Sequence, residues 1–115
     1  MSKVDWYYHR PSWSTCAKTQ EFLATHKVEA VHLESTAKTA LPLKEVLALV
    51  EQIDEIYATK GQNVIHLDLR RDQPEETTLA ELLIGRTGNL RAPALRRGRT
   101  LMVGFNDEMY KQFFK

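Results

Sequence analysis

The sequence predicts an α/β fold in which a mixed β-sheet of four to five strands is flanked by helices, within one domain over residues 1–115. Its length and composition are those of a single globular domain, with 115 residues of which 43% are hydrophobic and 27% charged. Strand-like runs alternate with a helical segment in the first third of the chain. The last third has the pattern of strand, turn, strand and helix, which adds an antiparallel hairpin to the same sheet.

The first third predicts a strand, a helix and a second strand. Residues 4–8 are mostly β-branched or aromatic and precede a proline, which is typical of a strand followed by a loop. A helix is expected from about Ser14, with Cys16 on its inner face. Residues 28–33 alternate between apolar and polar side chains and predict the second strand.

The middle of the chain predicts a helical section between the second strand and the C-terminal hairpin. Pro42 suits the first turn of a long helix whose apolar residues keep a 3.6-residue period as far as Ile56. Gly61 is expected to end that helix. Residues 64–69 alternate again and predict a third strand, and Pro74 precedes a short helix with an acidic first turn.

The last third carries the clearest local signals. Residues 93–96 and 99–103 are two strand-like runs joined by Arg97-Gly98, which predicts an antiparallel hairpin with a glycine-containing turn. Asn106 is expected to cap a final helix that has two acidic residues in its first turn.

The composition excludes several classes of protein. No apolar run is long enough to span a membrane, and the first residues lack the apolar stretch of a secretory signal. A single cysteine cannot form an intramolecular disulfide or a zinc site with several thiolates. The four histidines show no metal-ligand spacing with carboxylates or thiols, so no metal site is predicted. No bound cofactor is expected either. We therefore expect a reduced, cytoplasmic protein without a membrane partner.

Positive charge is concentrated late in the chain although the net charge is only +1. Residues 82–106 contain no acidic residue but five arginines. These are Arg86, Arg91, Arg96, Arg97 and Arg99. Such a segment suits an anionic ligand such as a carboxylate, a phosphate or another oxyanion, and nucleic acid ranks below these. The hairpin arginines are also explained as solvated residues, and Arg91 is the preferred anion-binding candidate.

Chemistry is most plausible where the first strand meets the first helix. A thiol at a helix N-terminus gains from the amide dipoles, which lower its pKa, and redox enzymes place a Cys-x-x-Cys pair there. Cys16 occupies the second position of such a pair, and Trp13 occupies the first. The second cysteine of a pair is usually buried and inert, so the pattern alone favours a packing role for Cys16.

Three motifs resemble the arsenate reductase (ArsC) and Spx-type branch of the thioredoxin superfamily. They are YHRPSWSTCAK at 8–18, LRAP at 90–93 and LMVGFN at 101–106. The resemblance implies a thioredoxin-like fold and a cis proline at Pro93 that faces the redox motif and shapes a substrate groove. The alternative for Pro93 is an ordinary trans proline at the start of an edge strand, and the cis proline is preferred.

The departures from the family pattern bear on its function. The family has its nucleophilic cysteine at the position of Trp13, and arsenate reductases hold the oxyanion with arginines at the positions of Ala17 and Ala92. Arsenate reduction therefore ranks third among the functions considered. His9 matches a family histidine, but a polar residue at a strand end explains it equally well.

The first hypothesis is a thiol or selenol disulfide oxidoreductase whose nucleophile belongs at position 13. The tryptophan codon differs by one base from both cysteine codons and from UGA, which is also read as selenocysteine. A native cysteine or selenocysteine at this position would complete a pair with Cys16, which would resolve the mixed disulfide. With Trp13 the chain is expected to be redox-inactive, since one sulfur cannot close the cycle.

The resemblance assigns supporting roles to residues on both sides of the motif. Lys18 and the first-turn amides would stabilise the anion, while Ala92 and Pro93 would offer backbone groups to an extended disulfide or mixed-disulfide substrate. Arg91 would hold a carboxylate of glutathione or of the substrate. Glutathione or a thioredoxin-type protein would be the reductant.

The alternative hypothesis is a non-enzymatic interaction module, similar to the Spx-type regulators that bind RNA polymerase. In that case the scaffold is retained for binding, and the indole of Trp13 fills the groove as an apolar platform. A stable protein partner without thiol-dependent turnover would distinguish this alternative.

Overall fold

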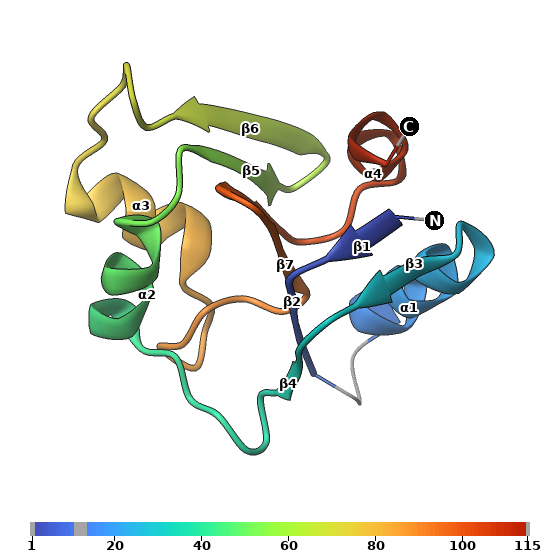
Figure 1. Ribbon diagram of the computed structural model, residues 1–115. Coiled ribbons are helices and arrows are strands. Elements are labelled where there is room, and N and C mark those ends of the chain that lie inside the picture. The colour runs from blue at the N-terminus through green and yellow to red at the C-terminus, as the bar shows by residue number, and fades with distance from the viewer. Residues whose placement is uncertain (1, 11–13, 115) are drawn as a thin grey trace.

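The structure is a computed structural model that describes residues 2–10 and 14–114 (Figure 1). The helices in the described part are α1 (Ser14–Thr25), α2 (Leu43–Val50), α3 (Glu76–Leu83) and α4 (Asp107–Phe113). The strands are β1 (Ser2–Val4), β2 (Trp6–His9), β3 (Val28–Ala30), β4 (Leu33–Ser35), β5 (Glu55–Lys60), β6 (Asn63–Asp68), β7 (Ala94–Arg97) and β8 (Thr100–Val103).

The described strands form a mixed sheet in the order β4-β2-β7-β8-β5-β6. The pairs β2–β4 and β5–β8 are parallel, and the other neighbours are antiparallel. A separate two-stranded parallel sheet joins β1 to β3. Figure 1 shows α2 and α3 on one side of the six-stranded sheet and α1 and α4 on the other. The predicted α/β class with a mixed sheet is confirmed.

The prediction of a long helix from Pro42 to Gly61 is wrong beyond Val50. Helix α2 ends there, and the following residues form β5, in which Ile56 and Ala58 are buried. A short apolar run is compatible with both the helical and the strand period, so hydrogen bonding to neighbouring strands decides whether it forms a helix or a strand. Strand β5 gains two neighbours, β6 and β8, so the extended conformation is favoured. Gly61 lies in the turn between β5 and β6 at φ 62°, a backbone conformation that glycine adopts readily.

Two further predicted strands lie at the expected positions, but each is divided into two shorter strands. The first strand is interrupted at Asp5, whose N–H donates to the Arg96 carbonyl at 2.8 Å. The second is interrupted after Ala30, so that β3 pairs with β1 whereas β4 pairs with β2. These breaks separate β1 and β3 into the two-stranded sheet, whereas β5 is the additional strand that gives the main sheet six strands where four to five were predicted.

The C-terminal predictions are confirmed. Strands β7 and β8 form the antiparallel hairpin, with Gly98 in its turn at φ 61°. Asn106 caps α4, because its side-chain Oδ1 accepts a hydrogen bond from the Met109 N–H at 2.9 Å. Strand β6 and helix α3 also occupy the segments predicted for them.

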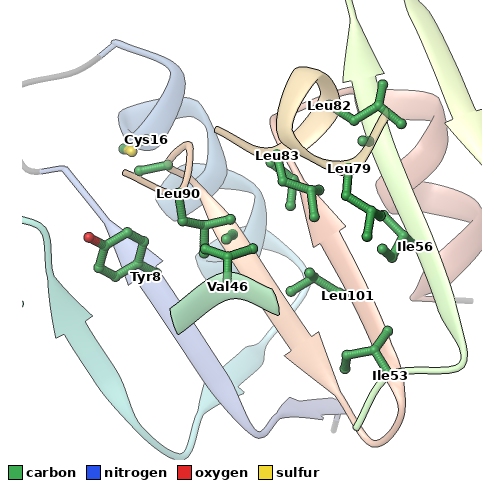
Figure 2. Packing of buried hydrophobic residues seen from close by; sticks show 14 residues of the cluster. Tyr8, Cys16, Val46, Ile53, Ile56, Leu79, Leu82, Leu83, Leu90 and Leu101 are labelled. Carbon is green, nitrogen blue, oxygen red and sulfur yellow. The ribbon is translucent and has the colours of Figure 1, made fainter. Parts of the chain in front are cut away.

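Apolar side chains fill both faces of the sheet. On the α2–α3 face, Figure 2 shows a largely aliphatic cluster that reaches as far as Tyr8 and Cys16. On the α1–α4 face the cluster is rich in aromatic rings, among them Tyr7, Phe22 and Tyr110. No helix in the described part is long and apolar enough to cross a membrane.

Candidate functional site

Cys16 lies in the first turn of α1, as the sequence predicts, but its side chain is enclosed. It is 1% exposed and belongs to the apolar cluster on the α2–α3 face (Figure 2). The backbone N–H of Arg10 donates to Sγ at 3.2 Å, and the Tyr7 hydroxyl donates to the Cys16 carbonyl at 3.4 Å. The end of β2 and the start of α1 are thereby joined through this residue.

Burial raises the pKa of the Cys16 thiol above its ordinary value. The Arg10 N–H and the positive charge of Arg10 act in the opposite direction, but the loss of solvation is the larger effect. The group is therefore a thiol rather than a thiolate at neutral pH, in spite of its place at a helix N-terminus. Trp13, the predicted nucleophile position, lies outside the described residues.

His9 ends β2 and is half-buried. Its Nδ1 atom is buried and has no hydrogen-bond partner in the described part of the chain. Its ring packs beside the Tyr7 ring, with 5.4 Å between the two centroids. Both sequence-based interpretations of His9, as a family site residue and as a polar strand end, stay predictions.

Lys18 is exposed on α1 and lies apart from the cluster that contains Cys16. It lines a shallow depression together with Phe22, Phe105 and Asp107. The acidic neighbour lowers the positive potential that Lys18 could offer to an anion. Its proposed role in stabilising an anion stays a prediction.

Arg91 is half-buried and bound to the chain itself. Its Nη1 donates to the carbonyls of Thr59 at 2.8 Å and Leu82 at 2.9 Å, and its Nη2 donates to Thr59 Oγ1 at 2.9 Å. These bonds tie the segment before β7 to β5 and α3. The sequence predicted a ligand-binding role for Arg91, which stays a prediction, and it contained no signal of this structural link.

The peptide bond between Ala92 and Pro93 is cis, as the family resemblance implies. Both residues are buried, and the Pro93 carbonyl accepts a hydrogen bond from the Gly104 N–H at 2.8 Å. Ala92 belongs to the same apolar cluster as Cys16. The other described site residues, His9, Lys18, Arg91 and Pro93, are not members of this cluster.

One feature that the sequence did not predict is a cavity of about 460 Å³ beside the end of β2. Its lining includes Tyr8, Arg10, Arg86 and Arg91. The acid-free segment over residues 82–106 was the available signal, but only the folded chain brings part of that segment next to β2. Elsewhere in the described chain, no group of three His, Cys, Asp or Glu side chains could hold a metal ion.

Comparison with known proteins gives a consistent set of relatives. A model of the ArsC family matches residues 8–113. The regulatory protein MgsR of Bacillus subtilis (strain 168) is 36% identical over 103 residues, which cover 87% of this chain and 82% of the relative. Global transcriptional regulators named Spx 1 from Oceanobacillus iheyensis and Spx from Listeria innocua are each 28% identical over 109 residues, which cover 92% of this chain and 83% of each relative.

The family match agrees with the architecture described above. A mixed sheet with helices on both faces is consistent with the thioredoxin-like fold that the three motifs implied. Because the family model covers nearly the whole chain, and because the relatives align over most of their own lengths, this protein belongs to the ArsC family.

Proposed function

We propose that this protein is a non-enzymatic regulatory module that acts by binding a protein of the transcription apparatus. Its relatives MgsR and Spx are named as a regulatory protein and as global transcriptional regulators. The Spx-type regulators that the motifs resemble bind RNA polymerase, which makes that enzyme the proposed partner. The observation that carries the proposal is the burial of Cys16, the single cysteine of the sequence.

A dithiol redox cycle needs one sulfur that attacks and a second that resolves the mixed disulfide. The chain contains a single cysteine, Cys16, and its side chain is 1% exposed. Burial also raises its pKa, which lowers the fraction of reactive thiolate. An enclosed, protonated and solitary thiol supports a packing role within a binding module.

Anion chemistry at this site is weakened as well. Ala17 and Ala92 stand where arsenate reductases carry arginines, and Arg91 donates three hydrogen bonds within the chain. Arsenate reduction therefore stays the third candidate.

The second candidate is a thiol or selenol disulfide oxidoreductase with cysteine or selenocysteine at position 13. The position of Cys16 favours it, because this sulfur lies in the first turn of α1, where a resolving cysteine belongs. Such an enzyme would act on a disulfide or mixed disulfide, with glutathione or a thioredoxin-type protein as reductant. The codon of the native gene tests the selenocysteine form directly, since a TGG codon at position 13 would exclude it.

One experiment separates the two candidates. The parent chain, Cys16→Ser and Trp13→Cys are assayed for binding to bacterial RNA polymerase and for turnover of a glutathione mixed disulfide with excess reductant. We expect the parent to bind and Cys16→Ser to bind within about twofold, because the buried sulfur offers no surface for contact.

The opposite result would support the oxidoreductase. In that case the parent does not bind, and Trp13→Cys loses both free thiols on mild oxidation and then turns over the substrate. Failure of the parent to bind RNA polymerase would in itself contradict the proposed partner.

A further inference from the structure

The described lining of the cavity of about 460 Å³ beside β2 comes from three separate parts of the chain. Tyr8 lies in β2 and Arg10 follows it, Thr36 and Ala37 come from the turn after β4, and the other described lining residues come from the segment before β7. The Thr36 N–H donates to the His9 carbonyl at 2.9 Å, and the Tyr8 hydroxyl donates to the Thr39 carbonyl at 2.7 Å. These bonds hold the wall beyond β4 in place.

The lining of this cavity is positively charged. Arg10, Arg86 and Arg91 contribute to it. All fifteen acidic residues of the chain lie in the described part, and none of them lines the cavity. The oxygens that bind the Arg91 guanidinium belong to Thr59 and Leu82 and are neutral, so no carboxylate of this chain cancels its charge there.

Arg86 lies in a hydrogen-bonded turn that contributes to the cavity lining. The Gly88 N–H donates to the Gly85 carbonyl at 3.1 Å, and the Gly85 N–H donates to the Asn89 carbonyl at 2.8 Å. Arg86 is the second residue of the resulting turn. Its side chain is exposed and forms no hydrogen bond or ion pair with other described residues. The hydrogen-bonded turn therefore presents a guanidinium that no described residue binds.

The remainder of the lining is partly apolar. The buried side chains of Tyr8, Leu90 and Ala92 contribute to it. A glutamate or aspartate of a bound protein could place its methylene groups on this surface and its carboxylate at the arginines, where charge-assisted hydrogen bonds form. Nucleic acid fits less well, because the chain has a net charge of +1 and this feature is a single concavity rather than an extended basic stripe.

We propose that this cavity receives an acidic segment of the protein partner, with Arg86 as the principal contact for its carboxylates. This inference rests on the proposed function and names the chemistry of the partner surface. It does not involve the Cys16 thiol, which is not part of the described lining.

The test uses the full-length chain and three variants. Arg86→Glu reverses the charge at the rim, Arg86→Lys keeps it, and Arg71→Glu makes the same change in net charge at an exposed arginine outside the cavity lining. Each protein is measured for affinity to bacterial RNA polymerase. Each is also titrated with a hexaglutamate peptide and with hexaglutamine, while the amide NMR signals of Gly85, Thr87 and Asn89 are followed.

Arg86→Glu is expected to weaken binding of RNA polymerase by about tenfold or more, because it leaves a partner carboxylate facing another carboxylate. Arg86→Lys should recover most of the affinity, and Arg71→Glu should stay within about twofold of the parent. Hexaglutamate should shift the three amides saturably in the parent but not in Arg86→Glu, whereas hexaglutamine should leave them unchanged.

Equal losses in Arg86→Glu and Arg71→Glu would overturn the proposal, since they would indicate only a general charge effect. An unchanged affinity of Arg86→Glu for RNA polymerase would overturn it too. The same holds if a parallel titration with a single-stranded oligonucleotide shifts the three amides more than hexaglutamate does. If the parent fails to bind RNA polymerase but hexaglutamate shifts the cavity amides, the proposed function fails while the acidic ligand class of the cavity is supported.

Discussion

The two faces of the main sheet are packed in different ways. The face under α2 and α3 is filled mainly by aliphatic side chains, of which Leu83 and Ile56 are fully buried (Figure 2). The face under α1 and α4 is filled by rings that meet edge to face, such as Phe22 and Tyr110 at 5.3 Å between centroids. The stability of the first face depends on close packing of side chains, and the stability of the second depends on the geometry of the ring contacts.

The aromatic face also contains a buried tyrosine hydroxyl with hydrogen-bond partners. On the aromatic face, the Tyr110 hydroxyl donates to the Gly104 carbonyl at 3.1 Å and lies 3.5 Å from Thr19 Oγ1. Burial raises the pKa of this hydroxyl, which keeps its proton available for donation. We therefore expect truncation of a buried aliphatic side chain to lower the free energy of unfolding most on the α2–α3 face. On the α1–α4 face, loss of a single hydroxyl should already lower it.

The largest effect is expected from Leu83→Ala on the aliphatic face. Leu83 is 0% exposed, so the truncation leaves a cavity that its neighbours fill only in part. The free energy of unfolding should fall by about 3 to 5 kcal/mol in urea denaturation. Leu33→Ala is the matched control, because Leu33 is 57% exposed and should lose less than about 0.5 kcal/mol. Similar losses in both variants would contradict the packing described for this face.

Gly104→Ala tests the close approach between Gly104 and Thr59. The Gly104 carbonyl accepts a hydrogen bond from the Tyr110 hydroxyl, and the residue has φ 89°. A Cβ added at Gly104 would overlap Thr59 Oγ1 and lie 3.0 Å from Thr59 Cβ. We expect a loss of about 2 to 4 kcal/mol from backbone strain and steric overlap together. Gly61→Ala supplies the control, because Gly61 has φ 62° but no atom within 4 Å of an added Cβ. It should lose only about 1 to 2 kcal/mol, and equal losses would disprove the overlap with Thr59.

Tyr110→Phe sharpens the comparison with the smallest change, since it deletes one oxygen from the aromatic face. The Gly104 carbonyl would lose its hydroxyl donor, which should lower the free energy of unfolding by about 1 to 2 kcal/mol. Tyr57→Phe is the control, because the Tyr57 hydroxyl has no hydrogen-bond partner in the described part of the chain. Thermal unfolding of the two variants should separate them. A Tyr110→Phe variant as stable as the parent would show that the hydroxyl contributes nothing there.

The candidate site was predictable in parts only. The location of Cys16 in the first turn of a helix and the cis bond before Pro93 followed from local motifs and from the family resemblance. The enclosure of Cys16 did not, because its cluster includes residues from distant segments such as Val46 and Leu90. The cavity at Arg86 was equally hidden, since its walls come from three separate parts of the chain.

The sequence by itself determined the features that depend on residues a few positions apart. These include the β7–β8 hairpin with its glycine turn, the Asn106 cap of α4 and the presence of one sulfur in the chain. Only the tertiary structure decided that residues 55–60 form a strand, that the Cys16 thiol is closed off, and that Arg91 binds Thr59, 32 positions away. The physical reason is that caps and turns are satisfied locally, whereas strand pairing, burial and the partners of a charged group depend on segments that meet only when the chain folds.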